Sequence, residues 1–283
     1  MAITRRNLFG VGGAAAVGLA LPAPSRAQVV EDSFPPLPTF YGGDNQADFV
    51  PKPLLGNVPP PAIDRQVAAK LIELAPYNCT PLEVATYFRD IGQGIIPDLK
   101  SPALQARVGR HFVRGWPRFY NPLIIEFFKS TTLDPTNVDG DGTHWCAAFV
   151  NWCIARSRST TSSPVLTPEA RRSGTRSASS GSFRCWPTAQ SVTNTPKRGD
   201  VVVWARDGTV SGCSIGTGHV AFFLEELSDG RILVIGGNQR DPETVAGATQ
   251  SAVCQKAIPK VYSIPRTDKK KRFHSYRSAN FLT

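Results

Sequence analysis

The segment Thr143-His-Trp-Cys-Ala-Ala-Phe-Val-Asn-Trp-Cys153 holds the pattern around which the chain is organised. Its apolar residues recur at three- and four-residue steps, which predicts an amphipathic helix over residues 144–156. Cys146 comes three residues after Thr143, a residue type that often caps helices, so we expect its thiol in the first turn. Backbone N–H groups are unpaired in that turn and the helix dipole favours negative charge, so the position suits a thiolate nucleophile.

The cysteines of this helix also allow a purely structural interpretation. Cysteine is among the most buried residue types, and Cys153 lies on the apolar stripe as a core residue does. Cys146 lies beside the stripe, at the electropositive end of the helix. We take Cys146 as the candidate nucleophile, with a buried core cysteine as the alternative.

A cysteine nucleophile needs a base, and the chain has four histidines. His144 is two residues from Cys146, a spacing that does not face it on a helix. His219 opens an apolar strand expected over residues 219–225 and is our candidate base. A pair of Cys213 with His219 is the second choice, because Cys213 lies in a Ser/Gly-rich loop with no helix N-terminus to activate a thiol.

A third group must orient the imidazole, and Asn238 is the candidate. It belongs to Gly236-Gly-Asn-Gln239, at the end of a strand that begins at residue 232. A turn around Asp229 pairs this strand with the one that begins at His219. For a loop of two or of four residues, alternation places His219 and Asn238 on the same sheet face, directly opposite or one diagonal step apart.

Helices are expected before and at the cysteine, and antiparallel strands after it, which predicts an α+β fold. A loop rich in Ser, Thr and Arg is expected between them, over residues 157–183. Helices are expected over residues 62–75, 122–129 and 144–156. A further helix is expected to start directly after Thr80, which would cap it. The expected strands cover residues 200–205, 219–225, 232–235 and 251–262.

Four blocks, in this order along the chain, resemble the CHAP group (cysteine, histidine-dependent amidohydrolases/peptidases): Thr143–Cys153, Pro196–Val203, Gly218–Phe222 and Gly236–Gln239. The resemblance covers about residues 116–265. It implies a papain-like domain related to the NlpC-type wall peptidases, with helices packed on an antiparallel sheet. It also implies Cys146 as nucleophile, His219 as base and Asn238 as orienting group, acting on an amide or peptide bond of peptidoglycan. We expect Trp145, Gly218 and Gln239 to contact that substrate.

The reaction that these residues imply is acyl transfer through a thioester on Cys146, followed by hydrolysis. One alternative keeps the fold but transfers the acyl group or acts on another amide. A second alternative is a wall-binding module without catalysis, in which Cys146 is buried. The hydrolase interpretation requires the three side chains to converge beside an open groove.

The N-terminus has the pattern of an export signal. Paired arginines, Arg5 and Arg6, precede a 14-residue, weakly hydrophobic stretch over residues 8–21, and a small-residue cleavage pattern ends at Ala27. This resembles a twin-arginine signal peptide over residues 1–27, which makes the twin-arginine translocase a partner and predicts a periplasmic or secreted protein. No cysteine lies near the cleavage site, so we expect no stable membrane anchor. Residues 28–62, rich in Pro and Gly, are expected to be a linker.

Composition limits the remaining possibilities. The chain has 283 residues, 41% of them hydrophobic, and a formal net charge of +10, which excludes wholesale disorder. We expect a helical subdomain over residues 63–115 and a basic C-terminal tail over residues 266–283. The basic run that starts at Lys269 is of a kind that most often forms a solvated face. If it binds a polyanion, we expect wall polymers or lipid headgroups rather than nucleic acid, because no nucleic-acid motif accompanies it.

We expect no cofactor. Asn137, Asp139 and Asp141 match the opening of an EF-hand calcium loop, which makes them a weak calcium candidate. The closing glutamate is absent, because Ala148 occupies its place. Such residues are also ordinary in turns.

Overall fold

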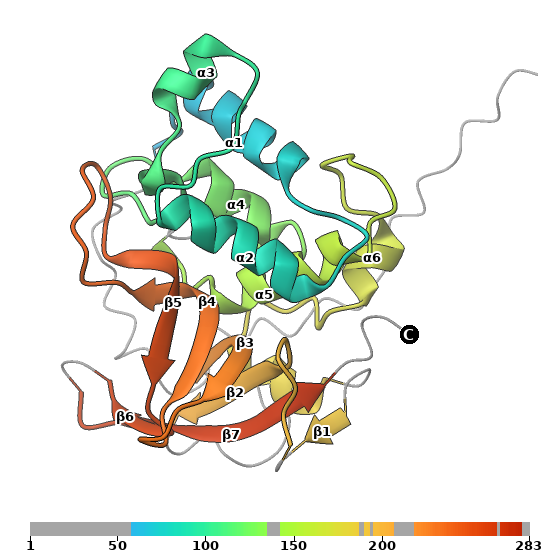
Figure 1. The fold of residues 1–283 in the computed structure, drawn as a ribbon, viewed down its shortest axis with the longest axis vertical. Coiled ribbons are helices and arrows are strands. Elements are labelled where there is room, and N and C mark those ends of the chain that lie inside the picture. The colour runs from blue at the N-terminus through green and yellow to red at the C-terminus, as the bar shows by residue number, and fades with distance from the viewer. Residues whose placement is uncertain are drawn as a thin grey trace, which may run out of the picture. The chain divides into compact units, whose positions relative to one another are not determined.

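The computed structural model describes residues 58–134, 142–186, 190–192, 195–206, 218–264 and 267–278. Within them, helices lie against a curled antiparallel sheet, as Figure 1 shows. The expected α+β class, with N-terminal helices packed on an antiparallel sheet, is confirmed. The twin-arginine signal and most of the linker lie outside the described residues and stay predictions.

The described helices begin where the sequence places caps and prolines. Thr80 and Glu83 form a reciprocal capping box at the start of α2, as the sequence indicates. Asn121 caps α4 by accepting a hydrogen bond from the Leu123 N–H. None of the described helices is long and apolar enough to cross a membrane. Their bounds are α1 Ala62–Leu74, α2 Pro81–Gly92, α3 Pro102–Arg107, α4 Pro122–Phe128, α5 Cys146–Ser157 and α6 Pro168–Arg172.

The strands pair in the order β1-β7-β2-β3-β4-β5, and β6 pairs with β7. Every pair is antiparallel. Among the described residues the strands are β1 Gln190–Val192, β2 Val201–Arg206, β3 Gly218–Glu226, β4 Ile232–Arg240, β5 Ser251–Ile258, β6 Val261–Ser263 and β7 Lys270–Ser278.

One hydrophobic core joins the N-terminal helices to the helix that carries Cys146. Phe88 of α2 contacts both Phe127 of α4 and Trp152 of α5 through edge-on rings. The same cluster continues into the face of the sheet that carries Val220 and Phe222. The boundary expected near residue 116 therefore does not separate two cores.

The C-terminal segment differs from the expected basic tail. Residues 270–278 form β7, which lies between β1 and β2 in the sheet. Its run of basic residues hides the alternation that marks a strand, because lysine and arginine count as polar on both faces. Tyr276 nevertheless packs against Phe223 on the sheet face opposite the helices. The strand brings Lys271 close to the start of β3.

Candidate active site

Cys146 is the first residue of α5, but Thr143 does not cap the helix as the sequence suggests. The cap position belongs to Trp145, which makes no side-chain capping bond, and the Thr143 hydroxyl is buried without a hydrogen-bond partner. The first turn of α5 thus keeps unpaired N–H groups, including those of Cys146 and Ala147. Both of these N–H groups favour the thiolate of Cys146 and lower its pKa.

The Cys146 side chain is 5% exposed and faces the beginning of β3. Burial is the largest influence on the thiol and raises its pKa above the usual value. The Lys271 ammonium and the backbone N–H of Val220 act in the opposite direction and lower it. Because Val220 follows His219, this contact places the sulfur beside the strand position that carries the imidazole.

His219 is 6% exposed, and burial lowers its pKa to about 3. The charge of Lys271 lowers this pKa further, whereas the Gln239 side chain raises it. The imidazole is therefore neutral at physiological pH and can accept a proton. Its ring lies 5.8 Å from that of Trp204, centroid to centroid, and its Nε2 atom is buried without a hydrogen-bond partner.

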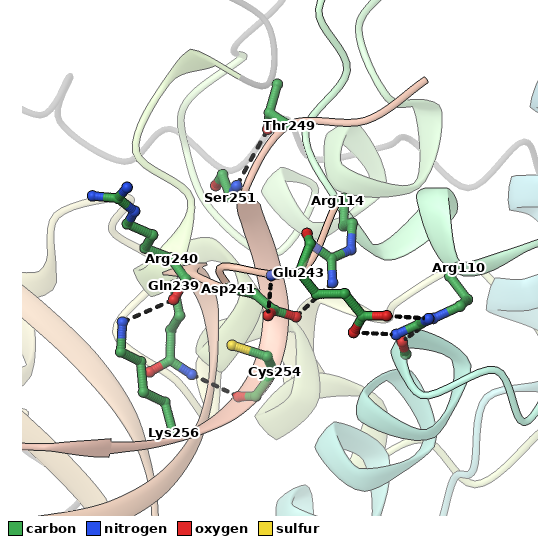
Figure 2. Close-up of polar contacts among 11 residues, drawn as sticks. Arg110, Arg114, Gln239, Arg240, Asp241, Glu243, Thr249, Ser251, Cys254 and Lys256 are labelled. Atoms are coloured by element: carbon green, nitrogen blue, oxygen red, sulfur yellow. Dashed lines mark hydrogen bonds and ion pairs between the residues drawn. The ribbon is translucent and has the colours of Figure 1, made fainter. Parts of the chain in front are cut away.

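Gln239 presents a single free acceptor to its surroundings. Its side chain is 3% exposed, and Nε2 donates to the Gly236 carbonyl at 3.0 Å and to the Cys254 carbonyl at 2.7 Å. Figure 2 shows the second of these bonds. With both N–H groups used in this way, the buried Oε1 atom is left without a partner. An N–H on Nε2 of His219 is the complement of this oxygen, which accounts for the effect of Gln239 on the histidine.

Asn238 makes no hydrogen bond with His219, contrary to the expected arrangement. Its Nδ2 pairs with Nδ1 of His144 at 3.2 Å, and its Oδ1 accepts from the Ser251 hydroxyl at 2.6 Å. The pairing of β3 with β4 begins one residue away from the expected register, with Glu226 opposite Ile232, and an irregularity between Phe223 and Glu225 then restores it, with Phe222 opposite Ile235. If that pairing continued without interruption, Asn238 would lie opposite His219.

A bulge in β4 breaks this continuity. On the partner strand β5, Gly236 pairs with Cys254 but Gln239 pairs with Ala252, so β4 contains one extra residue. Asn238 has a φ of 54°, in the left-handed region. One extra residue reverses the alternation, so that Gln239 lies over Gly236, on the face that Gly236 shares with Ala221 and His219. The adjacent glycines and an asparagine, which tolerates positive φ, are the sequence signal for this bulge.

Two other residues expected to contact substrate have structural roles. Trp145 is fully buried, and a Cβ on Gly237 would lie 2.5 Å from its ring, so close packing of α5 on β4 requires this glycine. A Cβ on Gly218 would lie 2.0 Å from the Trp204 carbonyl oxygen, which makes a side chain at that position impossible without moving β2. Trp145 therefore belongs to the core instead of a substrate surface.

Lys271 and Tyr262 belong to the site and were not expected from the sequence. They lie opposite each other in the pairing of β6 with β7. Nζ of Lys271 donates to the Gly218 carbonyl at 2.8 Å and lies 6.0 Å from the centroid of the Tyr262 ring. Burial raises the pKa of the Tyr262 hydroxyl, and a charge on Cys146 raises it further. No local pattern marks Lys271 within a run of basic residues.

A pocket of about 210 Å³ lies beside this site, on the side of β4 and β5 that meets α2. Arg110 binds both carboxylate oxygens of Glu243, and Arg114 pairs with Asp241 (Figure 2). These four residues, which we call the ion-pair cluster, hold the segment after β4 against the chain before α4. Cys146 and His219 do not line the pocket. The open groove expected beside the thiol is therefore not this pocket.

The remaining cysteines and the calcium candidate add no second centre within the described residues. Cys79, Cys153 and Cys254 are free thiols whose pKa burial raises, and Cys185 is disulfide-bonded. Asn137, Asp139, Asp141 and Cys213 lie outside the described residues. In the part of the chain that the structure describes, no three His, Cys, Asp or Glu residues are grouped to hold a metal ion.

Comparison with known proteins gives one match. No curated protein and no solved structure matches the chain. A family model, that of the CHAP domain, matches residues 138–238, a span that contains α5, β3 with His219, and β4 except for its last two residues, Gln239 and Arg240. The chain thus contains a CHAP domain at residues 138–238, which suggests an amidohydrolase.

Proposed function

We propose that this protein is an exported cysteine amidase or endopeptidase that hydrolyses amide bonds in the peptide of peptidoglycan. One observation carries the proposal: within the span matched by the CHAP domain, the sulfur at the N-terminus of α5 faces the backbone next to a neutral, buried histidine. Nucleophilic acyl transfer needs a thiol and a neutral imidazole close to each other, and here the sulfur lies next to the backbone of Val220, the residue after His219.

The chemistry begins with a thiol and a neutral imidazole. His219 accepts the proton of Cys146 as the sulfur attacks the amide carbonyl carbon. The imidazolium then gives this proton to the leaving amine, the C–N bond breaks, and a thioester remains on Cys146. Water attacks the thioester with His219 as base, which releases the carboxylic acid and restores the thiol. The unpaired N–H groups of the first turn of α5 can stabilise the carbonyl oxygen as it becomes negative.

The third member of this site is Gln239 in our proposal, in the place that the sequence assigned to Asn238. Its Nε2 donates to two backbone carbonyls, so its Oε1 is left to accept a hydrogen bond, and His219 is the donor that we assign to it. Such a bond keeps the proton on Nε2 of His219 and leaves Nδ1 as the base toward the sulfur.

A second candidate function follows from the burial of Cys146 and His219. A wall-binding module that has kept a CHAP fold without catalysis would enclose both residues in the same way. The two candidates differ in the reactivity of the thiol, since an inert core cysteine reacts no faster with an alkylating reagent than a free thiol does at neutral pH. A catalytic site must open far enough to admit its substrate.

The decisive experiment is digestion of purified peptidoglycan by the full chain, with released fragments identified by mass spectrometry. We expect amide cleavage by the wild type and none by Cys146→Ser, while Cys153→Ser on the same helix keeps its activity. Fragments joined to an added amine would identify an acyltransferase instead. Cleavage that survives in Cys146→Ser would reject the assignment, and binding of wall polymer without cleavage by the wild type would support the second candidate.

A further inference from the structure

We propose that Lys271 is the cation that stabilises negative charge on the sulfur of Cys146. A catalytic role for Lys271 rests on the proposed function, whereas the experiment that tests its effect on the thiol does not. It assigns an electrostatic role in the site to a residue of the last strand, far outside the span matched by the CHAP domain.

The position of Lys271 is set by pairing on both sides of its strand. In β7 it lies opposite Arg206 of β2 and opposite Tyr262 of β6. Its Nζ donates to the carbonyl of Gly218, which is the peptide group before His219, while the sulfur of Cys146 receives the N–H of Val220, which is the peptide group after it. The ammonium and the sulfur therefore lie next to the two peptide groups of β3 on either side of His219.

The ammonium of Lys271, a half-buried residue, has no carboxylate partner among the described residues. Lys271 makes one hydrogen bond, to a neutral carbonyl, and no ion pair with a carboxylate among the described residues. Two of its three N–H groups remain for another acceptor. The charged groups that face it are Arg206, which is also cationic, and the thiol of Cys146, whose anion favours the charged form of the lysine.

The reciprocal effects have the sign that the proposal requires. Lys271 lowers the pKa of the Cys146 thiol, and it lowers the pKa of His219 as well. A cation here therefore favours the thiolate and the neutral imidazole together. During attack, Lys271 offsets the charge that develops on sulfur while His219 takes the proton.

The test compares Lys271→Met, Lys271→Arg and the matched control Lys270→Met, which removes the same charge from the exposed neighbouring position in β7. The rate at which iodoacetamide alkylates Cys146 is measured against pH, with the modified peptide identified by mass spectrometry. Loss of an adjacent opposite charge raises a thiol pKa by about one unit or more. We therefore expect Lys271→Met to slow alkylation about tenfold or more at each pH below the thiol midpoint. Lys271→Arg and Lys270→Met should stay close to the wild type.

Equal alkylation profiles for Lys271→Met and Lys270→Met would overturn the proposal. Unfolding cannot imitate the expected result, because exposure of the thiol would accelerate alkylation. If the buried thiol does not react, its ultraviolet thiolate absorbance against pH, taken as the difference from the same protein carrying Cys146→Ser, must show the same upward shift. No substrate is used, so an inactive protein with this shift would reject the proposed hydrolase and keep the role of Lys271.

Discussion

Two polar regions lie two residues apart at the end of β4, at Gln239 within the strand and at Asp241 just after it, and they differ in how their charged and polar groups are paired. At Gln239 the structure buries a neutral histidine, a thiol and an amide oxygen, and leaves Nε2 of His219 and Oε1 of Gln239 without hydrogen-bond partners. At Asp241, the ion-pair cluster matches each carboxylate to an arginine at the protein surface or just below it. Buried polar groups in proteins are nearly always paired, so the unpaired imidazole and amide atoms mark the first region for chemistry, whereas the unpaired Nε of Arg114 in the ion-pair cluster belongs to a guanidinium whose other two nitrogens are bound.

The ion-pair cluster gives the largest expected effect on stability. Arg114 is 1% exposed, and Asp241→Asn would leave its guanidinium buried beside an amide N–H group instead of a carboxylate. We expect a loss of about 3 kcal/mol in the free energy of unfolding, because a buried charge would lose its counterion. Urea unfolding measures this loss.

The control for that change is Glu243→Gln, which removes the exposed carboxylate bound by Arg110. Arg110 remains accessible to water in this variant, so the urea midpoint should hardly change. Equal destabilisation by Asp241→Asn and Glu243→Gln would show that burial does not distinguish the two ion pairs.

Replacement of Gln239 tests whether the bulge in β4 makes this residue, instead of Asn238, the partner of His219 in the region with unpaired groups. Gln239→Ala should lower the rate of peptidoglycan cleavage on the order of 100-fold, because it removes the group that orients the general base. Asn238→Ala should have a much smaller effect, because Asn238 contacts His144 and Ser251.

A pH profile separates orientation of the base from structural damage. Gln239→Glu places a negative charge next to His219, which raises the imidazole pKa and should move the acidic limb of the pH–rate profile to higher pH. The assignment of Gln239 would be wrong if Asn238→Ala were the more damaging of the two alanine variants, or if the acidic limb did not move.

His219 should also make the free energy of unfolding depend on pH, with an effect per pH unit that is smaller than the loss expected for Asp241→Asn. The pKa of His219 is about 3 in the folded protein and 6.5 when unperturbed, so between these values the unfolded chain binds a proton that the folded chain does not. The free energy of unfolding should therefore fall as the pH decreases through this window, by about 1.4 kcal/mol per pH unit from this residue.

Thermal or urea unfolding of the wild type and His219→Gln, between pH 7 and pH 4.5 (roughly the upper part of the window in which the linkage applies), isolates that contribution. Carboxylates and the other histidines act equally on both proteins, so only the difference in slope is informative. Identical slopes would mean that His219 is not buried as a neutral imidazole in the folded protein.

Much of the fold could be predicted because its signals are local. The α2 cap needs only Thr80 and Glu83, three residues apart, and α5 follows from apolar spacing within one segment. The hairpin of β3 and β4 follows from the alternation of side chains along two strands and from the turn around Asp229 that joins them. By contrast, β7 could not be recognised, because a run of basic residues conceals its alternation and its pairing partners are distant in sequence.

The sequence by itself determined the α+β class, the place of Cys146 at a helix N-terminus and the strand that carries His219, since each depends on residues close together in the chain. The tertiary structure alone decided that Gln239 instead of Asn238 faces the histidine, because one extra residue in β4 reverses which side chains point to that face. It also decided that Lys271 reaches the site, because pairing between β7 and β2 joins segments more than 60 residues apart. Charge and hydrogen bonding at the site arise from contacts between distant segments, and only folding brings those segments together.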